Sequence, residues 1–107
     1  MVKELTNLEE FSEAIGNEKT GLVVVDFFTT WCNPCKKIAP MYESMSEKYT
    51  NIHFYKINAE NPSLQNITEA CEIISLPTFC LFKSGKYITR FVNADPVGLE
   101  KIILENM

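Results

Sequence analysis

The sequence lacks the basic residues that a nucleic-acid-binding surface needs. Arg90 is the only arginine, and the 107 residues carry a formal net charge of −4 at pH 7. No stripe of positive charge is available to neutralise phosphates. Nucleic acid is therefore not an expected partner.

Long hydrophobic runs are also missing. The longest apolar run extends from Leu22 to Val25 and continues past Asp26 to Phe28. A transmembrane helix needs roughly 20 apolar residues, so this run cannot cross a bilayer. The first ten residues contain one lysine and no apolar stretch of the kind found in secretory signals. We therefore expect no membrane association and a cytoplasmic location.

Metal ligands are scarce as well. His53 is the only histidine, and among the four cysteines only Cys32 and Cys35 form a C-x-x-C pair, since eight residues separate Cys71 from Cys80. A structural zinc site needs a second such pair or further histidines, so no metal is expected. As a structural disulfide the pair would close a very short loop and stabilise the fold by only about 2 kcal/mol. In the reducing cytosol, a close pair of this kind is typically catalytic.

The rest of the sequence alternates between strand-like and helix-like segments. Apolar and β-branched runs predict strands at 2–5, 22–28, 52–58, 78–83 and 86–92, with a Ser-Gly turn between the last two. Apolar residues at helical spacing predict one helix after each of the first three strands and one after the last. This order predicts an α/β domain with a mixed central sheet and helices on both faces.

Capping residues and apolar faces define the expected helices in more detail. The first helix is expected to begin with a Thr6–Glu9 capping box and to end at Gly16-Asn17. The second helix is expected to begin near Asn33-Pro34, and the last helix to be capped by Asp95. Pro40 is expected to kink the second helix. The expected buried faces are Leu8, Phe11 and Ile15; Ile38, Met41, Tyr42, Met45 and Tyr49; Leu64, Ile67 and Cys71; and Leu99, Ile102 and Ile103.

The cysteine pair lies where a buried strand passes into a helix. In the first turn, the helix dipole and the free backbone N–H groups favour a thiolate on Cys32. Cys35, one turn further on, should be more buried and less acidic, which suits a thiol that resolves a mixed disulfide. Asp26 lies inside the apolar strand, where burial should raise its pKa and prepare it for proton transfer.

Several segments resemble the thioredoxin family, and the resemblance runs nearly from end to end. They are VVVDFFTTWCNPCKKIAP, FYKIN, SLPTF, LFKSGK and the final amphipathic helix. The resemblance implies a thioredoxin fold, a central mixed sheet of about five strands flanked by four helices, in a single domain of residues 1–107. It also implies a small thiol-disulfide oxidoreductase that reduces protein disulfides by cycling Cys32 and Cys35 between dithiol and disulfide.

The resemblance also implies how the protein works with others. No bound cofactor is expected, because electrons would come from NADPH through a flavin-containing thioredoxin reductase. The expected partners are that reductase and disulfide-containing protein substrates such as peroxiredoxins. The protein is expected to be a monomer.

Roles for individual residues follow from the resemblance. Cys32 matches the exposed nucleophile, Cys35 the resolving thiol, and Asp26 the buried acid that helps to deprotonate it. Lys56 matches a lysine near that acid, and Trp31 an aromatic wall beside the disulfide. The expected substrate groove is lined by Trp31, Asn33, Leu76, the cis-proline Pro77, Val92, Asn93 and Ala94. Asn33 and Asn93 stand where the family usually has glycine.

Some of these residues also have a structural interpretation. Asp26 could pair with Lys56 as a core ion pair, Trp31 could be packing, and Pro77 an ordinary trans proline. Buried core positions are expected for Cys71, Cys80, Met41 and Met45. Two alternative functions remain open, a thioredoxin-like partner-binding subunit and an oxidising or isomerising thiol-disulfide enzyme.

Overall fold

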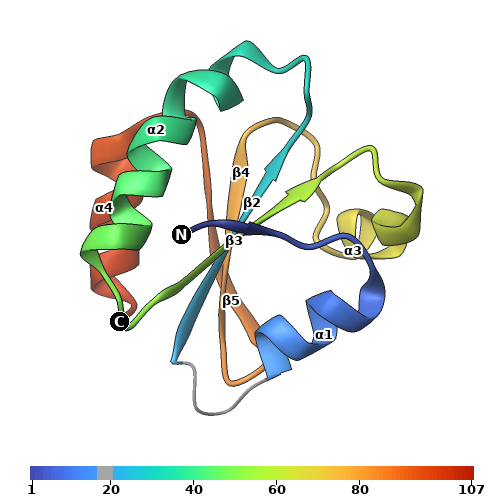
Figure 1. Ribbon diagram of the computed structural model, residues 1–107, viewed down its shortest axis with the longest axis horizontal. Helices are drawn as coiled ribbons and strands as arrows, with labels where there is room; N and C mark the ends of the chain where they lie inside the picture. The colour runs from blue at the N-terminus through green and yellow to red at the C-terminus, as the bar shows by residue number, and fades with distance from the viewer. Residues whose placement is uncertain (17–20) are drawn as a thin grey trace.

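A five-stranded mixed sheet forms the centre of the molecule (Figure 1). The computed structural model describes residues 1–16 and 21–107. Within them the elements are β1 (Lys3–Glu4), α1 (Leu8–Gly16), β2 (Leu22–Phe28), α2 (Asn33–Lys48), β3 (His53–Asn58), the 3-10 turn η1 (Pro62–Leu64), α3 (Gln65–Ala70), β4 (Thr78–Lys83), β5 (Lys86–Val92) and α4 (Pro96–Glu105). The strand order is β1-β3-β2-β4-β5. The predicted order of strands and helices is confirmed.

Strand β2 is the central strand, as its continuous apolar run predicts. It pairs in parallel with β3 and antiparallel with β4, while β1 is parallel to β3 and β5 is antiparallel to β4. Both faces of β2 are covered, and the first six of its seven residues are buried. A strand that is covered on both faces is apolar throughout and does not alternate between apolar and polar residues. The carboxyl group of Asp26 is therefore exceptional in this strand.

Helices cover the sheet in two layers. Helices α1 and α3 lie on one side, and α2 and α4 lie on the other (Figure 1). Val23, Val25 and Phe27 of β2 belong to the core cluster under α1 and α3. Leu22 and Val24 belong to the core cluster under α2 and α4. Because successive strand residues alternate between faces, Asp26 points to the α2 side.

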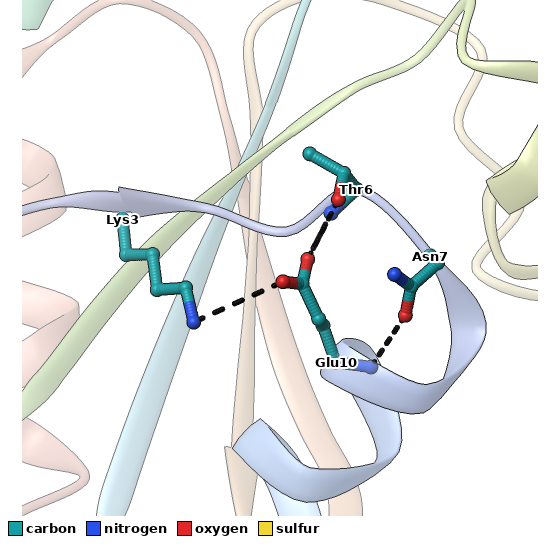
Figure 2. Close-up of polar contacts among 4 residues, drawn as sticks. All are labelled: Lys3, Thr6, Asn7 and Glu10. Atoms are coloured by element: carbon teal, nitrogen blue, oxygen red, sulfur yellow. Dashed lines mark hydrogen bonds and ion pairs between the residues drawn. The ribbon is translucent and has the colours of Figure 1, made fainter.

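The start of α1 corrects the predicted capping box. Asn7, not Thr6, is the N-cap, because its Oδ1 accepts a hydrogen bond from the Glu10 N–H at 2.8 Å. The carboxylate of Glu10, not Glu9, accepts hydrogen bonds from the backbone N–H and hydroxyl of Thr6, at 2.7 and 2.8 Å (Figure 2). Lys3 lies 4.0 Å from the same carboxylate. Asparagine caps at least as well as threonine, so the motif is shifted by one residue.

Two predicted core residues are exposed instead. Leu8 is 45% exposed and Met41 is 40% exposed. The buried face of α1 is formed by Phe11 and Ala14, because the helix begins at Leu8, whose side chain lies outside the core. Of the two methionines of α2, only Met45 is buried. The predicted end of α1 at Asn17 lies outside the described residues.

Two further local predictions, the cap of the last helix and the turn between β4 and β5, are confirmed. Asp95 caps α4 by accepting a hydrogen bond from the Val97 N–H at 3.1 Å. Ser84 and Gly85 have φ values of 54° and 77°, the left-handed pair that a two-residue hairpin turn requires. Pro40 lies inside α2, and the kink expected there stays a prediction. In the described part of the chain, no helix is both long enough and apolar enough to cross a membrane.

Candidate active site

Cys32 and Cys35 form a disulfide at the start of α2. Their Cα atoms are 5.3 Å apart. Cys32 is the N-cap of the helix, with an extended backbone, and Cys35 lies in the first turn. The sequence folds in this way because Pro34 has no N–H to donate and is tolerated in a first turn. The cysteine pair thus lies at the N-terminus of α2, the helix that follows β2.

The sulfur of Cys32 receives the capping interaction. The backbone N–H of Cys35 donates a hydrogen bond to the Cys32 Sγ atom at 3.2 Å. A hydrogen-bond donor and the positive end of the helix dipole both favour a negatively charged sulfur at this position. Once the disulfide is reduced, the geometry therefore stabilises a thiolate on Cys32.

The predicted difference in exposure between the two cysteines is wrong for the disulfide form. Both residues are 5% exposed, because the covalent bond holds the two sulfurs together at one helix end. The difference lies in what each residue faces. Cys32 lines an outer cavity, whereas Cys35 lines an inner cavity that also contains Asp26. The two thiols are therefore distinguished by environment, not by exposed area.

The outer cavity beside Cys32 has a volume of about 370 Å³. Its lining residues are Trp31, Cys32, Asn33, Pro34, Ile74, Ser75 and Leu76. Trp31 is 65% exposed and Ile74 is 94% exposed. Exposed apolar side chains around a reactive centre are suited to contact another protein. Trp31, Asn33 and Leu76 are thus brought together as predicted, and Ile74 is an addition that the sequence analysis missed.

Pro77 and the loop after β5 adjoin this cavity through the backbone. The peptide bond between Leu76 and Pro77 is cis, and the Asn93 N–H donates a hydrogen bond to the Pro77 carbonyl at 3.2 Å. Val92 is exposed at the end of β5, while Ala94 packs against the core under α2 and α4. Asn93 has a φ of 122°, a conformation that favours glycine.

Asp26 is 4% exposed, and burial raises its pKa from 3.8 to about 7. Lys56, its partner in the register between β2 and β3, opposes this shift through its positive charge. The side-chain ion pairs within the described residues are Lys3–Glu10 and Lys48–Glu100. Asp26 and Lys56 therefore do not form the direct ion pair of the structural interpretation. The Lys56 ammonium instead lies 5.4 Å from the centre of the Phe28 ring.

The inner cavity joins this carboxyl group to the second cysteine. It has a volume of about 280 Å³ and is lined by Asp26, Phe28, Thr29, Thr30, Cys35, Lys36, Ala39 and Lys56. Asp26 and Cys35 therefore line the same cavity as the amine of Lys56, although nine positions separate them in the sequence. A carboxyl group that titrates near neutral pH is suited to accept and return a proton there.

Thr29 is a residue of this site that the sequence analysis missed. It is 3% exposed. In the described part of the chain, its Oγ1 and the Oδ1 of Asp26 are the buried side-chain polar atoms without a hydrogen-bond partner. The signal in the sequence is a hydroxyl residue placed directly after the apolar run of β2.

Among the described residues, no cluster of three or more His, Cys, Asp or Glu side chains could hold a metal ion. The chemistry that the residues support is thiol-disulfide exchange. It requires a stabilised thiolate, a second thiol within disulfide distance and a nearby proton acceptor. Cys32, Cys35 and Asp26 meet these three requirements.

Comparisons with known proteins agree with this chemistry. The Thioredoxin family model matches residues 2–105. A thioredoxin-like protein of Acanthamoeba polyphaga mimivirus is 67% identical over 105 residues, which cover 98% of this chain and 77% of that protein. The thioredoxin of Plasmodium falciparum has a TM-score of 0.89 and 36% identity, and the match covers 98% of this chain and 99% of that chain.

A further solved structure concerns the thiol-resolving mechanism of yeast mitochondrial 1-Cys peroxiredoxin through the glutathione and thioredoxin systems. It contains a chain with a TM-score of 0.87 and 34% identity, over 97% of this chain and 94% of that one. The fold is thus the thioredoxin fold, and Cys32 and Cys35 are its redox-active pair. The chain belongs to the thioredoxin family of protein-disulfide oxidoreductases.

Proposed function

We propose that the protein reduces disulfides of other proteins and that Cys32 and Cys35 divide the two steps between them. The observation that carries this division is their separation into an outer and an inner cavity. The Cys32 thiolate attacks one sulfur of the substrate disulfide, and the other substrate sulfur leaves and takes up a proton. A mixed disulfide between Cys32 and the substrate results.

Cys35 resolves the mixed disulfide from the inner cavity. Its thiol transfers a proton toward the carboxylate of Asp26, and its sulfur attacks the Cys32 sulfur. The substrate leaves as a thiol, and the Cys32–Cys35 disulfide of the structure is the product. A carboxyl pKa of about 7 supports this role, because the group exists in both protonation states at neutral pH. Lys56 keeps that pKa from rising further.

The outer cavity is the proposed contact with the substrate chain. Trp31, Asn33 and Leu76 line it directly. Pro77 follows Leu76, and the loop Val92, Asn93 and Ala94 is tied to Pro77 by the Asn93 hydrogen bond. In this proposal the exposed edge of Trp31 and the Leu76 backbone receive an extended substrate segment beside Cys32.

The electron source and the partners follow from the family. Thioredoxins need no prosthetic group, and the redox-active group here is the disulfide itself. We propose that electrons come from NADPH through a thioredoxin reductase. The similarity to a chain in the yeast peroxiredoxin study supports peroxiredoxins as one class of substrate. We further propose a cytoplasmic monomer in which residues 1–107 form one domain.

Insulin reduction with dithiothreitol, followed by turbidity, tests the proposed activity. Wild-type protein should accelerate precipitation, and Cys32→Ser should not. Cys35→Ser should attack substrates and remain attached to them as a mixed disulfide, which non-reducing gels detect. An inactive wild type would favour a partner-binding subunit. A redox potential in the range of oxidising enzymes would favour that alternative class.

A further inference from the structure

Two buried polar atoms without a partner line the inner cavity that Asp26 shares with Cys35. They are the Oδ1 atom of Asp26 and the Oγ1 atom of Thr29, and their residues are 4% and 3% exposed. In the part of the chain that the structure describes, no other buried side-chain nitrogen or oxygen lacks a hydrogen-bond partner. Both atoms therefore lie where, in the proposed function, the resolving thiol loses its proton.

The hydroxyl of Thr29 is a burden on the folded protein. A hydroxyl group that is buried without a hydrogen bond lowers the free energy of unfolding. Such groups are rare in native proteins, and a catalytic role is one of the reasons for which they are kept. Valine has a similar shape and lacks the hydroxyl, so stability alone favours valine at position 29. The threonine therefore calls for a use in the reaction.

The backbone holds Thr29 in place beside the redox pair. Its carbonyl oxygen accepts a hydrogen bond from the backbone N–H of Cys32 at 3.3 Å. The carbonyl of Phe28, the preceding residue, accepts one from the Ala59 N–H at 2.7 Å. Threonine is branched at Cβ, which restricts rotation about its Cα–Cβ bond. The oxygen atom thus has a defined position, while the hydroxyl hydrogen is free to turn.

Thr29 also has the chemistry that a proton relay needs. A hydroxyl group can accept one hydrogen bond while it donates another. The ammonium groups of Lys36 and Lys56, which line the same cavity, have donors but no acceptor. Thr30 carries a second hydroxyl at this cavity, but its residue is exposed, so water competes for its hydrogen bonds. The buried hydroxyl is therefore the one suited to pass a proton to a buried carboxylate.

We propose that the Thr29 hydroxyl relays a proton from the Cys35 thiol to the Asp26 carboxylate. The relay acts while the mixed disulfide is resolved, so it rests on the proposed function. The Thr29 oxygen takes the proton of the Cys35 thiol, while its own hydroxyl proton passes to Asp26 Oδ1. The Cys35 sulfur attacks the Cys32 sulfur, the bond from Cys32 to the substrate breaks, and the substrate sulfur takes up a proton from the solvent. Asp26 afterwards returns its proton to the solvent, and Thr29 is unchanged.

The disulfide form accounts for the missing partner of the hydroxyl. In this form the Cys35 sulfur is bonded to Cys32 and has no proton to give. The relay gains its donor only after reduction, when Cys35 is a thiol. The Thr29 hydroxyl is therefore a cost in the oxidised protein and is used in the reduced one.

Ellman's reagent separates the two steps in which the relay is and is not involved. Reduced protein, in excess, attacks the reagent through Cys32 and releases one thionitrobenzoate. Cys35 then closes the disulfide and releases the second. Because the first release depends on protein concentration and the second does not, stopped-flow absorbance resolves them. Thr29→Val and Thr29→Ala should leave the first release unchanged and slow the second about tenfold, less than the full effect of a general base because Asp26 is still present.

Three further proteins separate a relay from a structural effect. Thr29→Ser keeps the hydroxyl and should release both thionitrobenzoates like wild type. Thr30→Val removes the exposed hydroxyl at the same cavity and should also react like wild type. In Asp26→Asn the second release should slow, and adding Thr29→Val should slow it no further, because the relay has already lost its acceptor.

The outcomes distinguish failure of the relay from failure of the proposed function. A second release that is equally fast in wild type and Thr29→Val would overturn the relay, as would a Thr29→Ser protein as slow as Thr29→Val. Independent, multiplying effects of Thr29→Val and Asp26→Asn would overturn it too, since the hydroxyl would then act outside the path to Asp26. An undiminished second release in Asp26→Asn would overturn the proposed proton acceptor itself, and the relay with it.

Discussion

Replacement of Asp26 by asparagine should stabilise the protein at neutral and alkaline pH. The pKa of Asp26 is raised from 3.8 to about 7, and burial is the main cause. The side chain is 4% exposed, and its Oδ1 has no hydrogen-bond partner in the described part of the chain. Folding therefore opposes ionisation of this carboxyl group, and an amide of the same shape removes that opposition.

The pH dependence fixes the sign and size of the effect. Below pH 3.8 both the folded and the unfolded protein hold the proton, so the free energy of unfolding is unaffected. Between pH 3.8 and about 7 the unfolded chain releases the proton and the folded protein keeps it, so stability falls as pH rises. At about 1.4 kcal/mol per pKa unit, a shift of about three units corresponds to a cost of about 4 kcal/mol above pH 7.

Urea unfolding of wild type and Asp26→Asn at pH 4, 5.5, 7 and 8.5 measures this cost. The stability advantage of the variant should be small at pH 4, increase through the middle values and level off above pH 7. Lys56→Gln provides the matched comparison, because loss of its charge should raise the Asp26 pKa further. At pH 8.5, Asp26→Asn should therefore stabilise the Lys56→Gln protein by more than it stabilises wild type. An advantage that does not change with pH, or a wild type that is more stable at pH 8.5, would refute the reasoning.

Three further predictions concern the fold around the site. Asn7→Ala should lower the free energy of unfolding by about 1 kcal/mol through loss of the α1 cap, whereas Glu9→Ala should change it by less than about 0.5 kcal/mol. Equal losses in urea unfolding would instead support the Thr6–Glu9 capping box. Thr29→Val should raise stability by about 1 kcal/mol, because it removes a buried hydroxyl without a partner, and the exposed Thr30→Val should not; thermal unfolding compares them. Gly98→Ala should destabilise by about 1–3 kcal/mol despite alanine's better helix propensity, because a Cβ atom there would lie 2.7 Å from the Phe91 ring; a higher melting temperature would contradict this.

The sequence predicted the elements of the fold well because their apolar patterns are strong and local. The run Leu22–Phe28 required a strand covered on both faces, and the structure makes it the central one. The start of α1 was missed by one residue, because Thr6 and Asn7 are both good caps and each has a glutamate three residues later. Only the packing of the helix distinguishes an N-cap at Thr6 from an N-cap at Asn7. In the structure, Phe11 and Ala14 are buried and Leu8 is exposed.

The parts of the site that sequence could not supply depend on contacts between distant segments. Ile74 looked like one more apolar residue before Pro77, and its 94% exposure follows from the path of the loop. Cys71 and Cys80 each fit the pattern of a small buried hydrophobe, and both are buried as predicted. The link that Arg90 makes between their two segments appears only when α3, β4 and β5 are brought together.

The active site itself needs little long-range structure. Leu22 and Val24 point to the α2 side of the sheet. Because every second residue of a strand points to the same face, Asp26 points to that side as well. The chain then leaves β2 after Phe28 and begins α2 at Asn33 on the same side of the sheet. Cys35, in the first turn, is thereby set over the face of the strand that carries the carboxyl group, and the two line one cavity. The proton acceptor and the resolving thiol thus meet through a single strand-turn-helix unit.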